Sequence, residues 1–382
     1  MSKLKISFYI TFLMLFVSHL FAQKTIDKTI SHGGLTRQYR LYIPANYNGS
    51  KSVPLLFNFH GFTSNNQQQE FYGDFRPLSN KEGFIICLPQ GTVGGPTSQT
   101  FFNVGFFPSA IDDLGFTNML IDTISAAYKI DAKRIYSCGM SNGGFMSYNL
   151  ACNSSRFAAV ASVTGSFTES MSKTCKPVRP TPIMEIHGTA DGTVPYNGMT
   201  GALTFLSIDS VLNYWVKFNK CNPIPTITDV ANTNTTDNAT AKRFVWTGGK
   251  GGVTIEHFKV EGGGHTWPGA AIPIGVTCQD FKASDEIWRF FKQYTLTVSS
   301  NDILDENSFK IYPNPTSHQL TIETDNQAEY QAQIIDLQGK MILKSTIAAA
   351  QKEIDVSDLP NGIYILRLSS EKGQINQKFV KN

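Results

Sequence analysis

The sequence lacks an excess of charge of either sign. Its 382 residues include 33 Lys and Arg against 30 Asp and Glu, a formal net charge of +3, and the basic residues are scattered along the chain. Proteins that bind nucleic acids usually concentrate positive charge on one face or in one stripe. The composition therefore excludes a nucleic acid as the expected partner.

Long hydrophobic runs are also missing, except at the N-terminus. A basic start is followed by an apolar run from Ile6 to Ala22, which is short for a membrane span. We interpret residues 1–22 as a secretory signal peptide, with an uncleaved N-terminal anchor as the alternative. Because no later segment is apolar enough to cross a bilayer, we expect a secreted mature protein without a membrane span.

Cysteine is scarce, and no Cys-x-x-Cys pair or His-rich spacing indicates a metal site. Cys87 and Cys138 lie within apolar, strand-like runs, which predicts that they are small core residues. The other four cysteines lie in loops or at the ends of predicted elements and are the better disulfide candidates in an exported chain. They are Cys152, Cys175, Cys221 and Cys278.

Short apolar runs alternate with segments of helical periodicity along most of the mature chain. This alternation predicts a mostly parallel β-sheet with helices on both faces, and therefore an α/β fold. The predicted strands are residues 37–44, 54–61, 83–91, 134–141, 157–165, 182–189, 241–247 and 253–260. The predicted helices are residues 111–130, 143–152, 203–220 and 285–294.

Ser141 stands in the pentapeptide Gly139-Met140-Ser141-Asn142-Gly143, between a predicted strand and a predicted helix. In the nucleophile elbow of α/β hydrolases, glycines in this spacing permit a sharp turn that places the serine at the carboxyl end of the sheet. The helix N-terminus also supplies positive partial charge where an oxyanion would form. The pentapeptide alone is a weak signal, because glycine-rich turns match it by chance.

An elbow serine needs an acid and then a histidine, in this order, on loops after later strands. Asp191 follows the strand-like run 182–189, and His265 lies in a glycine-rich loop after the run 253–260. The other histidines of the mature chain precede the acid, lie inside a strand or lie near the C-terminus. We therefore predict a catalytic triad of Ser141, Asp191 and His265, with His265 as the base.

The predicted oxyanion hole uses two backbone N–H groups. One belongs to Asn142, directly after the serine, and the other to Phe62, in the loop after the strand 54–61. His60 lies in the same loop. We interpret His60 as a residue that fixes this loop rather than as a base.

Residues 24–294 resemble a family of secreted esterases that includes polyhydroxybutyrate depolymerase-like enzymes, feruloyl esterases and acetylxylan esterases. The matching stretches are HGFTSN, GFIICLPQG, DDLGFTNMLID, GMSNGGFMSYNLAC, FAAVASVTGS, PIMEIHGTADGTVPY and GGGHTWPG. In that family the elbow serine, the Asp of His-Gly-x-x-Asp and the His of Gly-His-x-Trp-Pro form the triad. The resemblance thus implies the same three residues, Ser141, Asp191 and His265.

The chain departs from this family in its cysteines. Many members carry a Cys after the His-Gly of the oxyanion loop and a Cys-Trp pair after the Pro-Gln-Gly strand, where this chain has Phe62 and the aromatic run 100–107. The resemblance then leaves Cys152–Cys175 and Cys221–Cys278 as the expected bridges. We also expect Trp267 to contact the substrate, with packing of its loop against the core as the alternative.

The composition changes after residue 294. A polar linker is followed by strand-like segments broken by Gln-Gly, Asn-Gly and Lys-Gly turns, which predicts a small all-β sandwich. With YPNP near its start and LPNGIYILRL near its end, this part resembles the C-terminal sorting domain of the type IX secretion system. The resemblance implies export by that machinery, to the medium or the cell surface. A carbohydrate-binding module is the alternative.

Together these features predict a signal peptide (1–22), an α/β-hydrolase domain (23–296), a linker (297–307) and a sorting domain (308–382). We expect a secreted serine carboxylic-ester hydrolase that works through an acyl-enzyme, with no metal and no organic cofactor. The expected substrates are feruloyl or acetyl esters of plant cell-wall xylan, with a hydroxyalkanoate polyester or its oligomers as the alternative. A serine peptidase on the same fold and a surface binding protein with a disabled triad are the alternatives of other classes.

Overall fold

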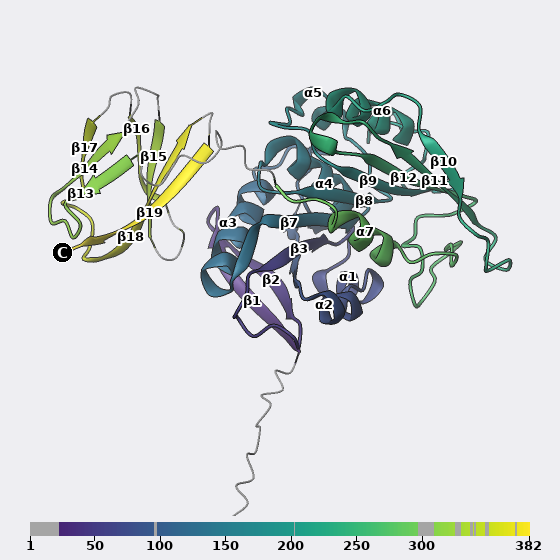
Figure 1. Cartoon of the computed structure of the whole chain (residues 1–382), viewed down its shortest axis with the longest axis horizontal. Coiled ribbons are helices and arrows are strands. Elements are labelled where there is room, and N and C mark those ends of the chain that lie inside the picture. The colour runs from purple at the N-terminus through teal and green to yellow at the C-terminus, as the bar shows by residue number, and fades with distance from the viewer. Residues whose placement is uncertain are drawn as a thin grey trace, which may run out of the picture.

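The computed structural model describes residues 23–94, 98–201, 203–296, 309–324, 330–336, 339, 341–347, 351–370 and 373–382. The predicted signal peptide (1–22) and the predicted linker (297–307) lie outside the described residues. The described elements form a large α/β unit followed by a smaller all-β unit (Figure 1).

The α/β unit is built on one ten-stranded sheet with the order β1-β2-β4-β3-β7-β8-β9-β12-β11-β10. The six central strands, from β4 to β12 in this order, run parallel, and the two strands at each edge pair antiparallel. The strands are β1 (Lys24–His32), β2 (Leu35–Ile43), β3 (Val53–Phe59), β4 (Ile85–Pro89), β7 (Ile130–Met140), β8 (Ala159–Val163), β9 (Ile183–Gly188), β10 (Thr226–Asp229), β11 (Thr240–Trp246) and β12 (Ile255–Glu261). A separate hairpin pairs β5 (Thr92–Gly94) with β6 (Gln99–Phe101).

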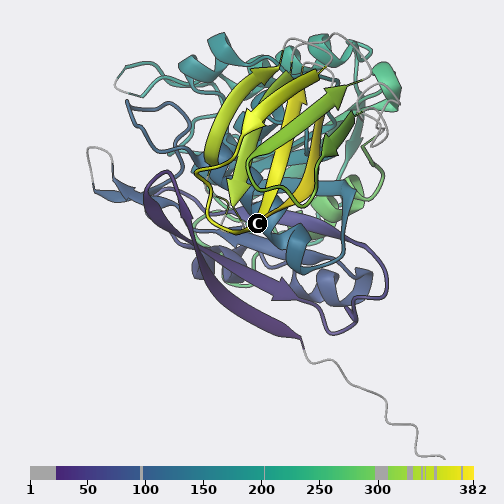
Figure 2. The ribbon, with the colours of Figure 1, turned by 90° about the vertical axis from the view of Figure 1, so that its left-hand side faces the viewer.

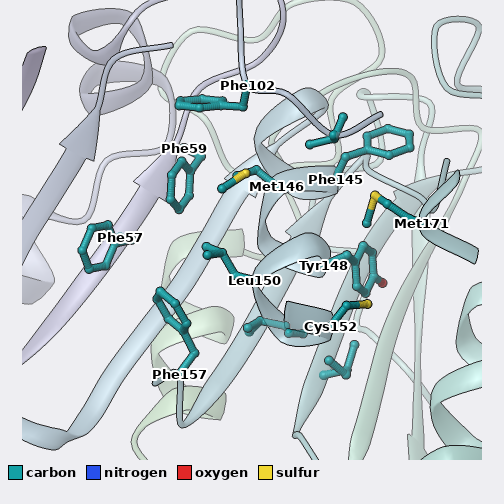
Figure 3. Packing of buried hydrophobic residues seen from close by; sticks show 14 of the residues in the cluster. Phe57, Phe59, Phe102, Phe145, Met146, Tyr148, Leu150, Cys152, Phe157 and Met171 are labelled. Carbon is teal, nitrogen blue, oxygen red and sulfur yellow. The ribbon is translucent and has the colours of Figure 1, made fainter. Parts of the chain in front are cut away.

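Helices cover both faces of this sheet because side chains alternate between two cores along the central strands. Leu55 and Phe57 of β3 belong to the core under α3, α4 and α6, whereas Leu56 belongs to the core under α2 and α7. Figure 3 shows Phe57 and Phe59 of β3 opposite Met146 and Leu150 of α4. The helices are α1 (Asn66–Tyr72), α2 (Arg76–Glu82), α3 (Asp113–Ala127), α4 (Asn142–Asn153), α5 (Glu169–Thr174), α6 (Ile208–Asn219), α7 (Ala283–Phe291) and a 3₁₀ turn at Lys250–Gly252.

This architecture confirms the predicted α/β fold, although the short elements α1, α2, α5, β5, β6 and β10 were not predicted and some bounds differ. The predicted helix 111–130 ends at Ala127 and β7 begins at Ile130, because the backbone is already extended at Tyr128 and the carbonyl of Lys129 accepts the N–H of Val53. The edge strand β1 was not predicted. Its side chains are mostly exposed, so no apolar alternation marks it in the sequence.

The C-terminal unit consists of two antiparallel sheets that share one apolar core (Figure 2, green to yellow strands). One sheet has the order β13-β14-β17 and the other β16-β15-β18-β19. This arrangement confirms the predicted small all-β sandwich. The strands are β13 (Phe309–Tyr312), β14 (Gln319–Thr324), β15 (Tyr330–Asp336), β16 (Met341–Ile347), β17 (Gln351–Asp355), β18 (Gly362–Ser370) and β19 (Gly373–Lys381).

One of the two expected disulfides is present. Cys152, at the end of α4, is bonded to Cys175, directly after α5. The expected Cys221–Cys278 bridge is wrong, because both thiols are free and buried. Cys221 packs in the core on one face of the sheet and Cys278 in the core on the other, so the sheet separates them.

Candidate active site

Ser141 occupies a strained turn between β7 and α4. Its φ is +55° and its ψ is −122°, a conformation that residues other than glycine rarely adopt. A side chain at Gly139 would meet the backbone of Gly143, and one at Gly143 would overlap the carbonyl oxygen of Phe59 on β3. The elbow therefore presses against the neighbouring strand, and its two glycines are required by this close approach.

We expect Gly143→Ala to abolish the folded elbow. The new methyl group would overlap the carbonyl oxygen of Phe59 on β3. Because this oxygen belongs to the backbone of a central strand, it cannot move aside as a flexible side chain could. The free energy of unfolding should fall by about 3 kcal/mol or more, measured by urea denaturation. Gly192→Ala is the control, because a side chain there meets no atom within 4 Å. Unchanged stability of Gly143→Ala would contradict the described packing of the elbow.

Asp191 and His265 lie on loops that follow β9 and β12, which are neighbours in the sheet. The N–H of Ala190 donates to the carbonyl of Gly263 at 2.9 Å, so the backbone itself joins the two loops. His265 Nδ1 and Asp191 Oδ2 are 2.7 Å apart. The described geometry thus brings two of the three predicted triad residues into direct contact.

The carboxylate of Asp191 is held from both sides. Its Oδ1 accepts the N–H groups of Thr193 and Val194, each at 2.8 Å, while Oδ2 receives His265. Burial alone raises the pKa of Asp191, but its hydrogen bond to His265 and the neighbouring positive charge outweigh burial and bring the pKa below its usual value. Asp191 therefore stays ionised beside an imidazole that is about one-fifth exposed.

Ser141 lies at the same carboxyl edge of the sheet, at the end of β7, with β8 between β7 and β9. Within the part of the chain that the structure describes, Ser141 Oγ and His265 share no hydrogen bond. Catalytic hydrogen bonds are often long in the absence of substrate and shorten when substrate binds. The chain order of the three loops, after β7, β9 and β12, is the order serine, acid, histidine of α/β hydrolases.

The predicted oxyanion loop lies directly against Ser141. A Cβ atom built on Gly61 would be 3.4 Å from Cβ of Ser141. His60 Nδ1 lies 2.7 Å from the carbonyl oxygen of Gly61 and must donate to it, since a carbonyl only accepts. In a trans peptide the N–H points opposite to the C=O, so this bond turns the N–H of Phe62 away from His60.

His60 also fixes the loop from its other ring nitrogen. Its Nε2 accepts the N–H of Gly91 at 2.9 Å, which joins the oxyanion loop to the loop after β4. The ring is fully buried, and this burial lowers the pKa of His60 to about 4. Both nitrogens are occupied by backbone groups, which supports the interpretation of His60 as a residue that holds the loop.

We expect His60→Ala to lower kcat about 100-fold, because the Gly61–Phe62 peptide would lose the bond that orients it and an oxyanion donor would be misplaced. KM should change little, since the oxyanion forms only after substrate binds. The pH at which activity declines on the acid side should not move, because His60 is already neutral there. A moved acid limb in kcat/KM would instead identify His60 as a base.

The side chain of Asn142 makes two hydrogen bonds that the sequence did not reveal. Its Oδ1 accepts the N–H of Phe102 at 2.7 Å and its Nδ2 donates to the carbonyl of Phe102 at 3.0 Å. The backbone N–H groups of Asn142 and Phe62 have no hydrogen-bond partner within the described residues, so both remain available to an oxyanion. Asn142 therefore clamps the aromatic loop 100–107 onto the elbow.

Trp267, which we predicted to contact the substrate, is buried in this structure. Its side chain is among the largest that are fully buried, and only 1% of the residue is exposed. The indole N–H donates to Ser284 Oγ at 3.2 Å, and the ring packs edge-on against Phe75. The alternative role is therefore favoured, in which Trp267 packs its loop against the core.

One group of potential metal ligands is present among the described residues, formed by Asp237, Cys278 and Asp280. Their carboxylates already accept backbone N–H groups, for example that of Gln279 at 2.7 Å. These contacts explain the cluster as loop structure. We assign no metal to it.

The sheet order, the elbow and the acid–histidine pair define the fold class, an α/β hydrolase. The α/β unit matches a solved acetyl xylan esterase from Aspergillus awamori with a TM-score of 0.50, 16% sequence identity, and coverage of 70% of this chain and 99% of that chain. At this identity the match shows the shared fold.

Sequence comparison gives several relatives among esterases, two of which illustrate the similarity. The bifunctional acetylxylan esterase/xylanase of Neocallimastix patriciarum is 28% identical over 274 residues, which cover 72% of this chain and 36% of the relative. Feruloyl esterase B of Piromyces equi is 31% identical over 241 residues, which cover 60% of this chain and 42% of the relative. The chain thus spans less than half the length of these two relatives.

Residues 310–382 match the family described as secretion system C-terminal sorting domain. The chain is therefore a relative of the feruloyl and acetylxylan esterases that carries a C-terminal sorting domain, which marks it for secretion or cell-surface attachment. Among the residues that the structure describes, none of the helices is long and apolar enough to cross a membrane.

Proposed function

We propose that this chain is a secreted serine carboxylic-ester hydrolase that acts through an acyl-enzyme. The proposed catalytic groups are Ser141, Asp191 and His265. The observation that carries the proposal is the 2.7 Å contact between His265 Nδ1 and Asp191 Oδ2, at the sheet edge where the elbow holds the serine. The similarity to esterases supports the reaction class.

In the proposed reaction, Ser141 Oγ attacks the ester carbonyl carbon while His265 Nε2 takes its proton. Asp191 keeps the imidazole in the tautomer with a proton on Nδ1 and stabilises the imidazolium that forms. The N–H groups of Phe62 and Asn142 bind the oxyanion. The bond to the leaving alcohol then breaks, and His265 gives its proton to that alcohol.

The acyl-enzyme is resolved by water through the same groups. His265 takes a proton from the attacking water, whose oxygen forms the new bond to the acyl carbon. The second oxyanion then collapses, the bond to Ser141 Oγ breaks, and His265 returns the proton to the serine. The products are one carboxylic acid and one alcohol, and the residues return to their starting states.

The proposed substrates are feruloyl or acetyl esters of plant cell-wall polysaccharide, on account of the named activities of the relatives. The half-buried rings of Phe106 and Phe107 belong to the aromatic loop 100–107 that Asn142 clamps onto the elbow. These rings offer apolar surface to an acyl group. A hydroxyalkanoate polyester or its oligomers is the second candidate, since an apolar chain would use the same surface.

The proposed partner for export is the type IX secretion machinery, through residues 310–382. The sorting domain supports export but carries no information about the ester.

A panel of four substrates tests this proposal: methyl ferulate, acetylated xylan, a soluble hydroxybutyrate oligomer and a peptide. The purified protein is compared with its Ser141→Ala variant, which we expect to be inactive. We expect turnover of methyl ferulate or acetylated xylan that vanishes in the variant. Turnover of the oligomer alone would select the polyester, and turnover of the peptide alone would indicate a peptidase. Ester turnover that persists in the variant would overturn the assignment of Ser141.

A further inference from the structure

A second pair of ionisable side chains lies directly behind the acid–histidine pair. Glu185 and His187 sit on β9, and the side chains of both are 0% exposed. His187 Nδ1 is 2.9 Å from Glu185 Oε1. His187 Nε2 is 2.8 Å from the carbonyl oxygen of Val194 and 3.4 Å from Asp191 Oδ2. The imidazole of His187 therefore lies between two carboxylates.

The hydrogen-bond partners of His187 determine where its protons are. The carbonyl of Val194 only accepts, so Nε2 must carry a proton. Between Nδ1 and Glu185 Oε1 there must be one further proton, because two acceptors cannot face each other at 2.9 Å in a buried site. That proton belongs either to the imidazolium of His187 or to a neutral Glu185.

The groups around the pair favour the imidazolium. Burial raises the pKa of Glu185, but Tyr148, from α4, donates to Glu185 Oε2 at 2.7 Å and this bond stabilises the ionised carboxylate. Asp191 places a second negative charge at the other side of the ring. Burial opposes a charge on His187, but the two carboxylates outweigh burial and raise its pKa above the usual value.

The remaining polar groups near the pair do not reverse this balance. From β12, His257 Nδ1 lies 3.0 Å from the carbonyl of Glu185, and burial lowers the pKa of His257 to about 3, which keeps it neutral. Tyr196 packs edge-on against His187 and bonds to Asp209 of α6. Lys259 lies over the ring of Tyr196, with Nζ 5.4 Å from the ring centroid.

We infer that His187 is a cationic positioning residue that Glu185 holds in place and that fixes Asp191 and its turn for the reaction. This inference rests on the proposed function of the triad. His187 binds the turn at two points, the carbonyl of Val194 and the carboxylate of Asp191. The same turn folds around Asp191 Oδ1 through the N–H groups of Thr193 and Val194.

A positive His187 also affects the pH dependence of the proposed reaction through the charge of Asp191. It offsets part of the negative charge of Asp191, which would otherwise stabilise the protonated form of His265 more strongly. Glu185→Gln removes the carboxylate that keeps His187 charged while preserving its shape. The negative charge of Asp191 is then less offset, and we expect activity to begin only at higher pH.

The test compares the pH dependence of kcat/KM of Glu185→Gln with that of the wild-type protein, with p-nitrophenyl acetate as the ester. We expect the acid limb to move to higher pH by about half a unit, the effect of one partly screened charge near the imidazole. Glu256→Gln is the matched control, because Glu256 is a buried glutamate of the neighbouring strand that pairs with Arg243 and Arg289 instead. Its acid limb should stay in place.

A role in stability alone would lower the melting temperature of Glu185→Gln and leave the acid limb where it was, and that result would overturn the inference. A second measurement is independent of activity and of the variant's folding. In ¹H–¹⁵N spectra of the wild-type protein, both ring nitrogens of His187 should carry protons between roughly pH 6 and 8. A ring with an unprotonated Nδ1 would overturn the inference. If the protein hydrolyses no ester, the proposed function fails, and the spectra still decide the charge of His187.

Discussion

Replacing Ser141 with alanine is expected to lower kcat on the preferred ester about a millionfold. The rate that remains is that of uncatalysed hydrolysis in the buffer, increased by any effect of substrate binding alone. The variant lacks the oxygen that forms the acyl-enzyme, and no other hydroxyl of the described residues occupies the elbow. The rapid initial release of alcohol that accompanies formation of the acyl-enzyme should disappear together with steady-state turnover. The measurement is initial rate at saturating substrate, with folding checked by circular dichroism.

Ser147→Ala is the matched control for this loss. Ser147 lies on the same helix, is fully buried, and shares hydrogen bonds with Ser137 at 2.9 Å and with the carbonyl of Gly143 at 3.1 Å. Its removal should cost about 1 kcal/mol of unfolding free energy and leave kcat within a few-fold of wild type. If both variants lost activity equally, the loss would reflect damage to α4 and not the missing nucleophile.

Replacing Asp191 with asparagine is expected to lower kcat about 10⁴-fold. The carboxylate accepts from Thr193, Val194 and His265, and also faces the protonated Nε2 of His187. An amide must place an NH₂ group against at least one of these donors. Either the turn loses its hydrogen bonds, or His265 takes the tautomer with its proton on Nε2, and that nitrogen cannot then accept the serine proton.

For the same variant we also expect a loss of unfolding free energy that depends on pH. The pKa of Asp191 is lower in the folded protein than in the unfolded chain, where it is about 3.9. Its charge therefore stabilises the fold above that pH, and this contribution is lost as the pH falls through the lower, folded pKa. The difference in unfolding free energy between wild type and Asp191→Asn should shrink below about pH 4. A difference that stays constant with pH would contradict the depressed pKa.

The sequence was most informative where a turn requires a particular residue. Gly139 and Gly143 are recognisable because a close backbone contact excludes side chains there. Asp191 and His265 are recognisable because each follows an apolar strand, and parallel strands bring their carboxyl ends to one edge. The order of these motifs along the chain was thus enough to predict the fold class and which loops meet.

The sequence was least informative about contacts that cross between elements. In the sequence, Glu185 and His187 are two positions of a predicted buried strand without any mark of a further role. Only the fold shows that His187 faces the turn of Asp191. Trp267 is near His265 in sequence, but its ring turns into the core under α7. Cys221 and Cys278 were predicted to form a disulfide, but the sheet lies between them.

The disulfide between Cys152 and Cys175 links the export of the chain to the stability of its fold. It closes a loop with a sequence separation of 23 residues and ties the far end of α4, the helix that begins at Ser141, to the end of α5. A loop of this size contributes about 3 kcal/mol to stability once it is closed. Thiols remain reduced in the cytoplasm and oxidise outside it. The helix that begins at Ser141 therefore gains this cross-link only after the chain has left the cytoplasm, so the elbow acquires its full support only outside that compartment.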